Sequence, residues 1–235
     1  MIVLAIETAT IEVGAALVGD GGTLSVARAR SRRRHAEELA PAVESVVKAA
    51  GVELAAVDAV AVDVGPGLFT GLRVGIAAAK AFGWALGVPL VAVRSTETLR
   101  RGADEATRPP GVVVPVVDVR RGEFAWELPE GEPEIGPAAV FWRRIADLAG
   151  AVFVVGDGVP GVRASLGEAG RGAEVSFGDD ALAAPSVAVL GAIGLERLVA
   201  GATTDAGRIE PCYLRAADVR ANFETRAPVS PAGRD

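Results

Sequence analysis

Few residues in this sequence could carry out chemistry. His35 is the only histidine and Cys212 the only cysteine. A protein metal site needs three or four converging ligands, and no His-x-x-x-His or His-Glu-x-x-His spacing occurs, so we predict no metal centre and expect His35 to be a surface or capping residue. Serine hydrolysis needs a base oriented by a third group, and no Gly-x-Ser-x-Gly is present. The sequence therefore argues against a peptidase, and its single cysteine, which excludes an intramolecular disulfide, suits a reducing compartment.

A glycine-rich stretch, VDVGPGLFTGLRVG at 62–75, follows an apolar run and precedes a helical pattern. This layout is typical of a phosphate-binding loop, in which backbone N–H groups at a helix start bind an anion. The spacing fits neither common version of that loop. Thr70 stands where a dinucleotide fingerprint needs its third glycine, and Leu72 with Arg73 stands where a P-loop has lysine and a hydroxyl residue. We predict no standard phosphate loop here.

Small residues continue from that loop down a helix predicted at 72–86. Gly71, Gly75, Ala79 and Gly83 recur every four residues and therefore share one face. A glycine in a helix interior costs about 1 kcal/mol relative to alanine, so the repeated stripe needs a physical reason. Close packing against a partner protein is one reason, and packing against the chain's own sheet or a neighbouring helix is another. The sequence leaves both open.

The remaining pattern alternates strands and helices. In the first half, strands are predicted at 2–7, 13–19, 24–30, 56–64 and 89–93, and helices at 34–50 and 72–86. The second half begins similarly, because its apolar strand ends in Asp118 as the first strand ends in Glu7. We predict an α/β protein of two lobes of similar plan joined by residues 99–111. The pattern alone leaves an internal duplication open.

Charge and hydropathy exclude several classes of protein. The formal net charge is −6, whereas an isolated nucleic-acid binder is expected to be basic. The longest apolar window, 76–93, contains Lys80 and Pro89 and so fails as a membrane span, and the N-terminus lacks the basic segment and cleavage site of a signal peptide. We therefore expect a cytoplasmic protein without membrane contact.

Several short motifs resemble, in order, those of the bacterial TsaB family. They are AIETAT followed by GAAL, RHAEELAP with His35, GPGLFTGLRVGIAAAKAF, PLVAVRSTETL, VDVRRGEFA, GDG and the late PCYLR. The resemblance covers residues 1 to about 216, and the block at 65–75 is its most specific part. It implies an actin-like ATPase fold of two ribonuclease-H-like lobes with mixed sheets flanked by helices. The lobes are then expected at 1–102 and 103–221, followed by a flexible tail at 222–235.

The resemblance also implies a function. TsaB proteins are partner subunits of TsaD, which transfers a threonylcarbamoyl group to adenine 37 of ANN-decoding tRNA. This chain is accordingly expected to be noncatalytic and to bind and stabilise or activate TsaD, in a complex that also contains a TsaE-type ATPase. It is expected to contact tRNA only through that complex. When the partner is absent, it is expected to form a homodimer. The implied interface is the pair of helices at 34–50 and 72–86. Its expected residues are Leu39, Val43, Val46, Gly71, Leu72, Gly75, Ile76, Ala79 and Gly83.

The main alternative is a self-contained nucleotide-dependent kinase or ATPase of the same superfamily. An active enzyme of that kind needs a glycine soon after its first-strand acid, and the first glycine here is Gly14. The histidine pair that holds the metal in TsaD is also missing. As a partner subunit, this chain requires no cofactor, although ATP or ADP could bind weakly between the lobes. The expected contacts are Thr8, Thr10, Gly156, Asp157 and Gly158.

Arginine runs are the remaining candidates for contact with tRNA. They comprise Arg30 with Arg32 to Arg34, Arg100 with Arg101, and Arg143 with Arg144. Solvated surface charge is the simpler explanation of each run, given the acidic total.

Overall fold

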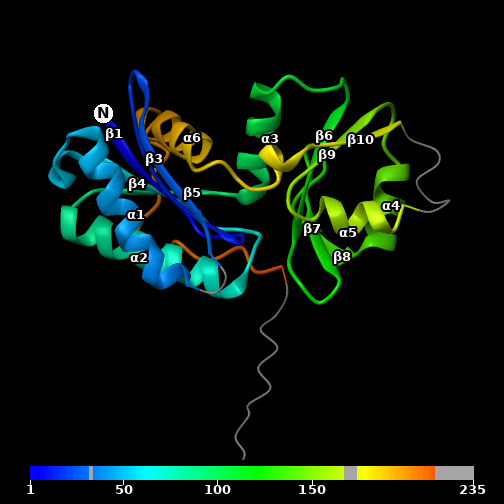
Figure 1. The fold of residues 1–235 in the computed structure, drawn as a ribbon, viewed down its shortest axis with the longest axis horizontal. Helices are drawn as coiled ribbons and strands as arrows, with labels where there is room; N and C mark the ends of the chain where they lie inside the picture. The colour runs from blue at the N-terminus through cyan, green and yellow to red at the C-terminus, as the bar shows by residue number, and fades with distance from the viewer. Residues whose placement is uncertain (32–33, 167–173, 215–235) are drawn as a thin grey trace, which may run out of the picture.

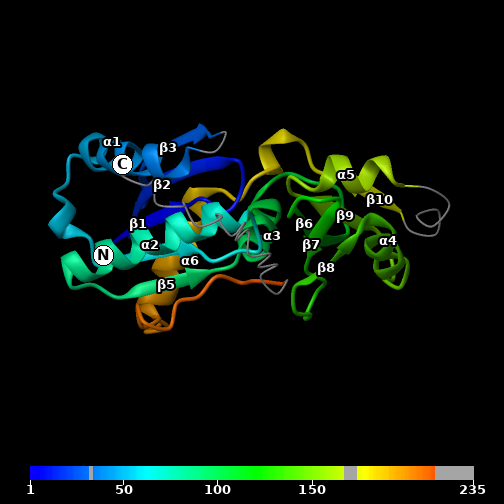
Figure 2. The ribbon, with the colours of Figure 1, turned by 90° about the horizontal axis from the view of Figure 1, so that it is seen from below.

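The computed structural model describes residues 1–31, 34–166 and 174–214. It has two lobes, each built on a five-stranded sheet, which lie side by side along the long axis of the molecule (Figures 1 and 2). The predicted tail at 222–235 lies outside the described residues. Within the part that is described, no helix is both long and apolar enough to cross a membrane.

The first sheet has the strand order β3-β2-β1-β4-β5. Its strands are β1 (Ile2–Glu7), β2 (Glu12–Gly19), β3 (Gly22–Arg30), β4 (Ala59–Asp63) and β5 (Leu90–Val93). The predicted antiparallel meander β1-β2-β3 is confirmed, and β4 and β5 continue the sheet in parallel with β1. Because the three central strands are buried on both faces, they read in the sequence as apolar runs.

Helices cover both faces of the first sheet. One face carries α1 (His35–Ala50) and α2 (Phe69–Leu86), and η1 (Leu54–Ala56) follows α1. Both long helices end at a glycine in the left-handed region, Gly51 and Gly87, as capping rules predict. The other face carries α6 (Val187–Val199), which arrives from the far end of the chain. The first lobe therefore has a core above and below its sheet.

The second sheet has the order β10-β9-β6-β7-β8. Its strands are β6 (Val112–Asp118), β7 (Glu123–Trp126), β8 (Glu134–Pro137), β9 (Val152–Val155) and β10 (Val175–Phe177). The helical elements α4 (Ala138–Ala146) and α5 (Val159–Ala164) lie on one face, and α3 (Ser95–Glu105) with η3 (Asp180–Leu182) lies on the other. Two mixed sheets flanked by helices confirm the predicted fold class.

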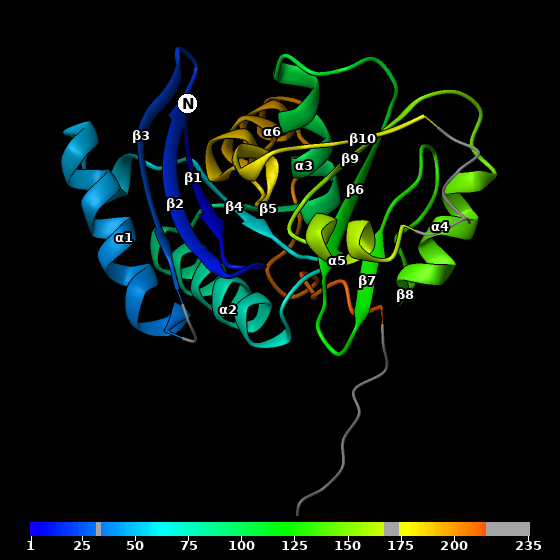
Figure 3. The same cartoon turned by 45° about the vertical axis from the view of Figure 1, so that its right-hand side comes forward.

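The connection between the lobes differs from the prediction. The sequence predicts a linker at 99–111, but α3 occupies 95–105. The helix is strongly charged, so its buried positions, Leu99 and Ala103, give too short an apolar pattern to stand out in the sequence. α3 packs on the second sheet and α6 on the first, and the two helices meet between the lobes (Figure 3). The predicted boundary between the lobes at residue 102 stays a prediction. Helix α6 comes later in the chain than this boundary, but it packs on the first sheet.

Candidate functional site

Two acidic side chains lie side by side at the carboxyl end of the first sheet. Glu7 and Asp63 end the parallel neighbours β1 and β4, and both are fully buried. Glu7 Oε1 accepts a hydrogen bond from the Ala9 N–H at 2.7 Å, and Asp63 Oδ1 accepts one from Ser95 Oγ at 2.6 Å. The sequence marked Glu7 as a strand-ending acid but gave no sign of Asp63, because only the parallel pairing of the strands brings the two together.

Both acids of this pair have raised pKa values. Burial raises the pKa of Glu7 well above its usual range, and the nearby charge of Asp63 raises it further. Burial also raises the pKa of Asp63, while hydrogen bonds from Glu7 and Ser95 oppose that rise. Among the described residues, Glu7 Oε2 and Asp63 Oδ2 are buried without a hydrogen-bond partner. We predict that the two carboxyl groups share a proton, which would satisfy both atoms.

We predict that Glu7→Gln removes a pH dependence of stability. The pKa of an unfolded glutamate is about 4.3, and the folded value is raised, so the folded state binds more protons in the interval between them. The stability of the wild type should therefore fall as pH rises from that unfolded value through the raised folded one. The amide that this substitution introduces can still donate to Asp63 and does not titrate. Urea unfolding at pH 5 and pH 8 should show a smaller loss for Glu7→Gln than for the wild type.

The matched control for that prediction is Glu44→Gln, a change at an exposed position of α1. It should follow the wild type at both pH values. Equal pH dependence in wild type and Glu7→Gln would show that Glu7 is ionised throughout this range, contrary to the shared proton.

A cavity of about 310 Å³ lies beside this acid pair. It is lined by Glu7, Glu12, Gly14, Val26, Arg28, Pro185, Ser186 and Val187. Its wall thus combines the first three strands with the start of α6. None of the five predicted nucleotide contacts lines it.

The predicted nucleotide contacts are engaged with the protein itself. In the first lobe, Thr8 Oγ1 donates to the Gly71 carbonyl at 2.9 Å, and Thr10 Oγ1 accepts from the Glu12 N–H at 3.3 Å. Both threonines are buried. A role for them in nucleotide binding stays a prediction.

In the second lobe, the predicted Gly-Asp-Gly turn packs against the end of β6. A Cβ on Gly156 would overlap the Val116 carbonyl, and one on Gly158 would lie 2.9 Å from a Val116 methyl group. Asp157 Oδ1 accepts from the Asp118 N–H at 2.8 Å, and burial raises the pKa of Asp157 to about 6. These glycines make room for the neighbouring strand.

His35 is buried, which corrects the expectation of a surface residue. Its Nε2 lies 2.8 Å from the Thr10 carbonyl, so it joins the start of α1 to the loop after β1. Among residues 1–31, 34–166 and 174–214, no three His, Cys, Asp or Glu side chains converge as metal ligands do.

The glycine-rich stretch holds the loop after β1. A Cβ at Gly67 would overlap the Ala9 carbonyl, and one at Gly71 would overlap the Thr8 carbonyl. The Leu68 N–H donates to that same Ala9 carbonyl at 2.6 Å. Gly65 has φ of 98°, a conformation that favours glycine. The backbone of the loop after β1 therefore lies directly against Gly67 and Gly71.

All nine predicted interface residues are buried in the chain's own core, and their role at an interface stays a prediction. They are Leu39, Val43 and Val46 on α1, and Gly71, Leu72, Gly75, Ile76, Ala79 and Gly83 on α2. The glycine stripe faces Thr8 and, at its far end, the side chain of Leu90. Of the two explanations left open by the sequence, packing within the chain accounts for these glycines.

The opposite side of α2 is exposed and mostly apolar. We define the outer face of α2 as Phe69, Arg73, Ala77, Ala81, Trp84 and Ala85, all of which are exposed. Trp84 is 87% exposed and Phe69 45%. Ala77 and Ala81 lie between these rings and Ala85 follows Trp84, so small side chains separate the two rings along about four turns. The sequence analysis did not predict this exposed face. A signal was available, because Trp84 does not follow the four-residue spacing of the buried stripe.

The late segment of the chain adds an aromatic ring to one end of this face. Tyr213 stacks on Phe69 with centroids 5.2 Å apart, and the Arg73 guanidinium lies 3.9 Å from the Phe69 ring centre. Arg73 Nε also donates to the Tyr213 hydroxyl at 2.9 Å. The segment is held in place by the buried Ile209 and by the Cys212 N–H, which donates to the Val64 carbonyl. Residues far apart in sequence thus complete one surface.

Several of the arginines considered for tRNA contact are paired with acids. Arg100 meets Glu127, Arg101 meets Glu105 and Glu196, Arg144 meets Glu134, and Arg34 meets Glu37. Arg32 and Arg33 lie outside the described residues. These pairs favour a structural use of the charge at Arg100 and Arg101 in particular.

The fold places the chain among two-lobed proteins of the actin-like ATPase and ROK kinase class. A ROK hexokinase from Thermus thermophilus superimposes with a TM-score of 0.51 at 14% identity, covering 83% of this chain and 99% of the hexokinase. YeaZ from Pseudomonas aeruginosa superimposes with a TM-score of 0.73 at 26% identity, covering 91% and 99%. The chain also resembles proteins named TsaB. It is 28% identical to the Escherichia coli tRNA threonylcarbamoyladenosine biosynthesis protein TsaB, over 92% of this chain and 95% of that protein.

Two further likenesses cover less of the sequence. Residues 26–137 match the family described as TsaD, tRNA N6-adenosine threonylcarbamoyltransferase. An uncharacterised protein of Mycobacterium tuberculosis is 40% identical over 58% of this chain. The chain spans 63% of that protein and 38% of a similar one from Mycobacterium leprae.

Proposed function

We propose that this chain is a noncatalytic subunit that binds and stabilises or activates a TsaD-type protein for formation of N6-threonylcarbamoyladenosine at adenine 37 of ANN-decoding tRNA. The observation that carries the proposal is the outer face of α2. An apolar strip with an 87% exposed tryptophan is unfavourable in water and suits a protein interface, where buried tryptophan and arginine side chains contribute most of the binding energy. The likeness to a protein named TsaB and the match of residues 26–137 to the TsaD family support the identity of the partner.

The proposed contact keeps helix α2 from the predicted pair of helices but uses its exposed side. We assign the contact to the outer face of α2, with Tyr213 extending it at the Phe69 end. A homodimer formed in the absence of the partner would use this same face, because a smooth strip can pair with its own copy about a two-fold axis. A TsaE-type ATPase and tRNA then join through the complex and need no separate site on this chain.

The alternative, a self-contained kinase or ATPase, is opposed by the way both candidate loops are closed. The loop after β1 is pressed against the glycine-rich stretch. The β6–β7 turn places Arg120 and Arg121 at positive φ, and Asp118 accepts hydrogen bonds from Arg120 at 2.7 and 2.9 Å. Neither loop presents a free row of N–H groups for phosphates.

Calorimetry with ATP and Mg²⁺ separates the two functions. We expect the isolated chain to show neither tight binding nor turnover, and the same titration of the complex to show what the catalytic subunit contributes. Tight binding with ATP hydrolysis by the isolated chain would overturn the partner-subunit proposal.

A further inference from the structure

Helix α3 is the crossover from the first lobe to the second, and its side chains reach in two directions. Leu99 and Ala103 are buried with Val113 and Phe153 in the core beneath the second sheet. The opposite side of α3 meets α6, which belongs to the layer over the first sheet. The contacts of α3 therefore decide how the two lobes are held relative to each other.

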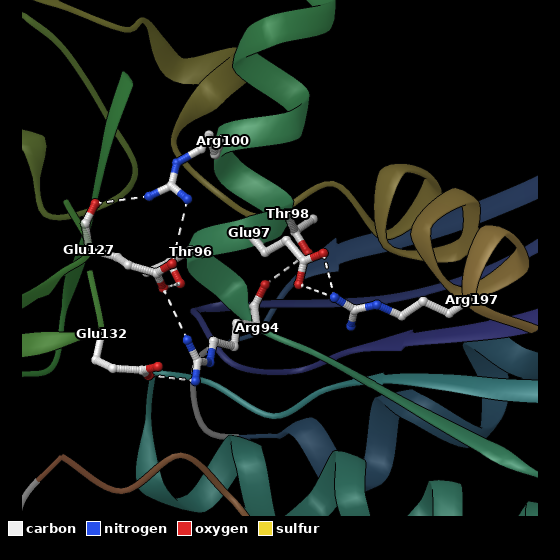
Figure 4. Close-up of polar contacts among 8 residues, drawn as sticks. All are labelled: Arg94, Thr96, Glu97, Thr98, Arg100, Glu127, Glu132 and Arg197. Carbon is white, nitrogen blue, oxygen red and sulfur yellow. Dashed lines mark hydrogen bonds and ion pairs between the residues drawn. The ribbon is translucent and has the colours of Figure 1, made fainter. Parts of the chain in front are cut away.

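Toward the second lobe, α3 is fixed by the segment that follows β7. Thr96 Oγ1 donates to Glu127 Oε2 at 2.5 Å, and Arg100 Nη2 donates to the Glu127 carbonyl at 3.0 Å. Glu127 is buried, and Arg100 Nη1 lies 3.5 Å from its Oε1. Arg94, just before α3, pairs with Glu132 at 2.7 Å (Figure 4). α3 thus moves with the second sheet.

Toward the first lobe, α3 is fixed by ion pairs to α6. Arg197 Nη2 donates to both carboxylate oxygens of Glu97, at 2.6 and 2.7 Å (Figure 4). Its Nη1 donates to the Ala92 carbonyl of β5 at 2.6 Å. Arg101 Nη2 pairs with Glu196 at 2.8 Å one turn further along α3. A single guanidinium therefore links α3, α6 and the edge of the first sheet.

These pairs are better placed than ordinary surface ion pairs. An exposed pair contributes little, because its side chains must be ordered and salt screens the attraction. Here Arg197 and Glu97 are each only 34% exposed, Arg197 Nη2 contacts both carboxylate oxygens, and Nη1 donates to a backbone carbonyl. Charge-assisted contacts of this geometry are the stronger kind.

We propose that these contacts form a clamp that fixes the angle between the two lobes. The α3 clamp comprises Glu97 with Arg197 and Arg101 with Glu196 on the first-lobe side, and Thr96 and Arg100 with Glu127 on the second. Proteins that close two lobes around a ligand do so by hinge motion at a few residues in the connection. In this chain the connection begins at Ser95, whose N–H donates to the Gly65 carbonyl at 3.0 Å, so the start of α3 is tied down as well. In this chain the contacts of the clamp, and not a bound ligand, set the angle between the lobes.

The test measures the distance between the lobes by double electron–electron resonance. Nitroxide labels are placed at Ser45→Cys on α1 and Ala146→Cys on α4, both exposed helical positions, in a Cys212→Ser background. Glu97→Gln and Arg197→Gln each break the central pair. Glu37→Gln breaks the exposed Arg34–Glu37 pair within α1 and serves as the matched control.

We expect one narrow distance distribution for the parent and for Glu37→Gln, and a broadened or shifted one for Glu97→Gln and Arg197→Gln. Distributions that coincide for all four proteins would overturn the clamp. If either variant loses its helical circular dichroism, Arg101→Gln, which breaks the more exposed pair with Glu196, is measured in its place. Broadening in that variant supports the clamp, and an unchanged distribution overturns it.

Discussion

Replacing Gly71 with valine should lower the free energy of unfolding by about 3 kcal/mol or more, the upper range for overpacking a tight contact. The Cβ would overlap the carbonyl oxygen of Thr8, and that atom is backbone, so it cannot move aside as a flexible side chain can. The Thr8 hydroxyl also donates to the Gly71 carbonyl, so separating the two segments breaks that bond as well. Urea denaturation followed by circular dichroism measures the loss.

Gly102→Ala is the control for Gly71→Val. Gly102 lies inside α3, and a Cβ there would come no closer than 4.0 Å to the Val189 side chain. Because alanine favours a helix by about 1 kcal/mol over glycine, this change should leave stability unaltered or raise it. Wild-type stability in Gly71→Val would contradict the close approach of α2 to the loop after β1.

The glycine-rich stretch shows what the sequence could and could not predict. Its spacing fits neither common nucleotide loop, and the four-residue stripe correctly indicated close packing. The surface against which the stripe packs depends on the tertiary fold, since Thr8 and Gly71 are 63 residues apart in the chain. A substitution such as Gly75→Arg would consequently disturb folding before it disturbed any interface.

The fold was predictable where the pattern was strong. The meander and α1 follow from apolar periodicity and from Gly51. Two features depend on contacts between distant residues and so escaped prediction. α3 is a charged helix stabilised by its contacts with both lobes, and the acid pair of Glu7 with Asp63 exists only because β1 and β4 are parallel neighbours.

Ala81→Arg should abolish most of the affinity for the TsaD-type partner. Ala81 lies in the centre of the outer face of α2 and is exposed, so the substitution leaves the fold intact. In the complex, the new side chain would place a charge within an apolar contact, which costs free energy unless the charge is paired. We expect binding to weaken by at least about 30-fold, or about 2 kcal/mol, as at interface positions of large effect. Titration calorimetry against the purified partner measures the affinity.

Ala146→Arg is the matched control, because Ala146 is an exposed helical alanine on α4 in the second lobe. It should bind the partner as the wild type does. A loss of affinity in both variants would indicate that added charge, and not its position on α2, weakens the complex.

The most direct test of the partner-subunit account is a reconstituted modification reaction containing the TsaD-type protein, its remaining components and tRNA, measured as labelled threonine retained on the tRNA. The account predicts modification when the wild-type chain or Ala146→Arg is present. It predicts little modification when the chain is omitted or replaced by Ala81→Arg. Equal modification without the chain, or with Ala81→Arg in place of the wild type, would contradict the account.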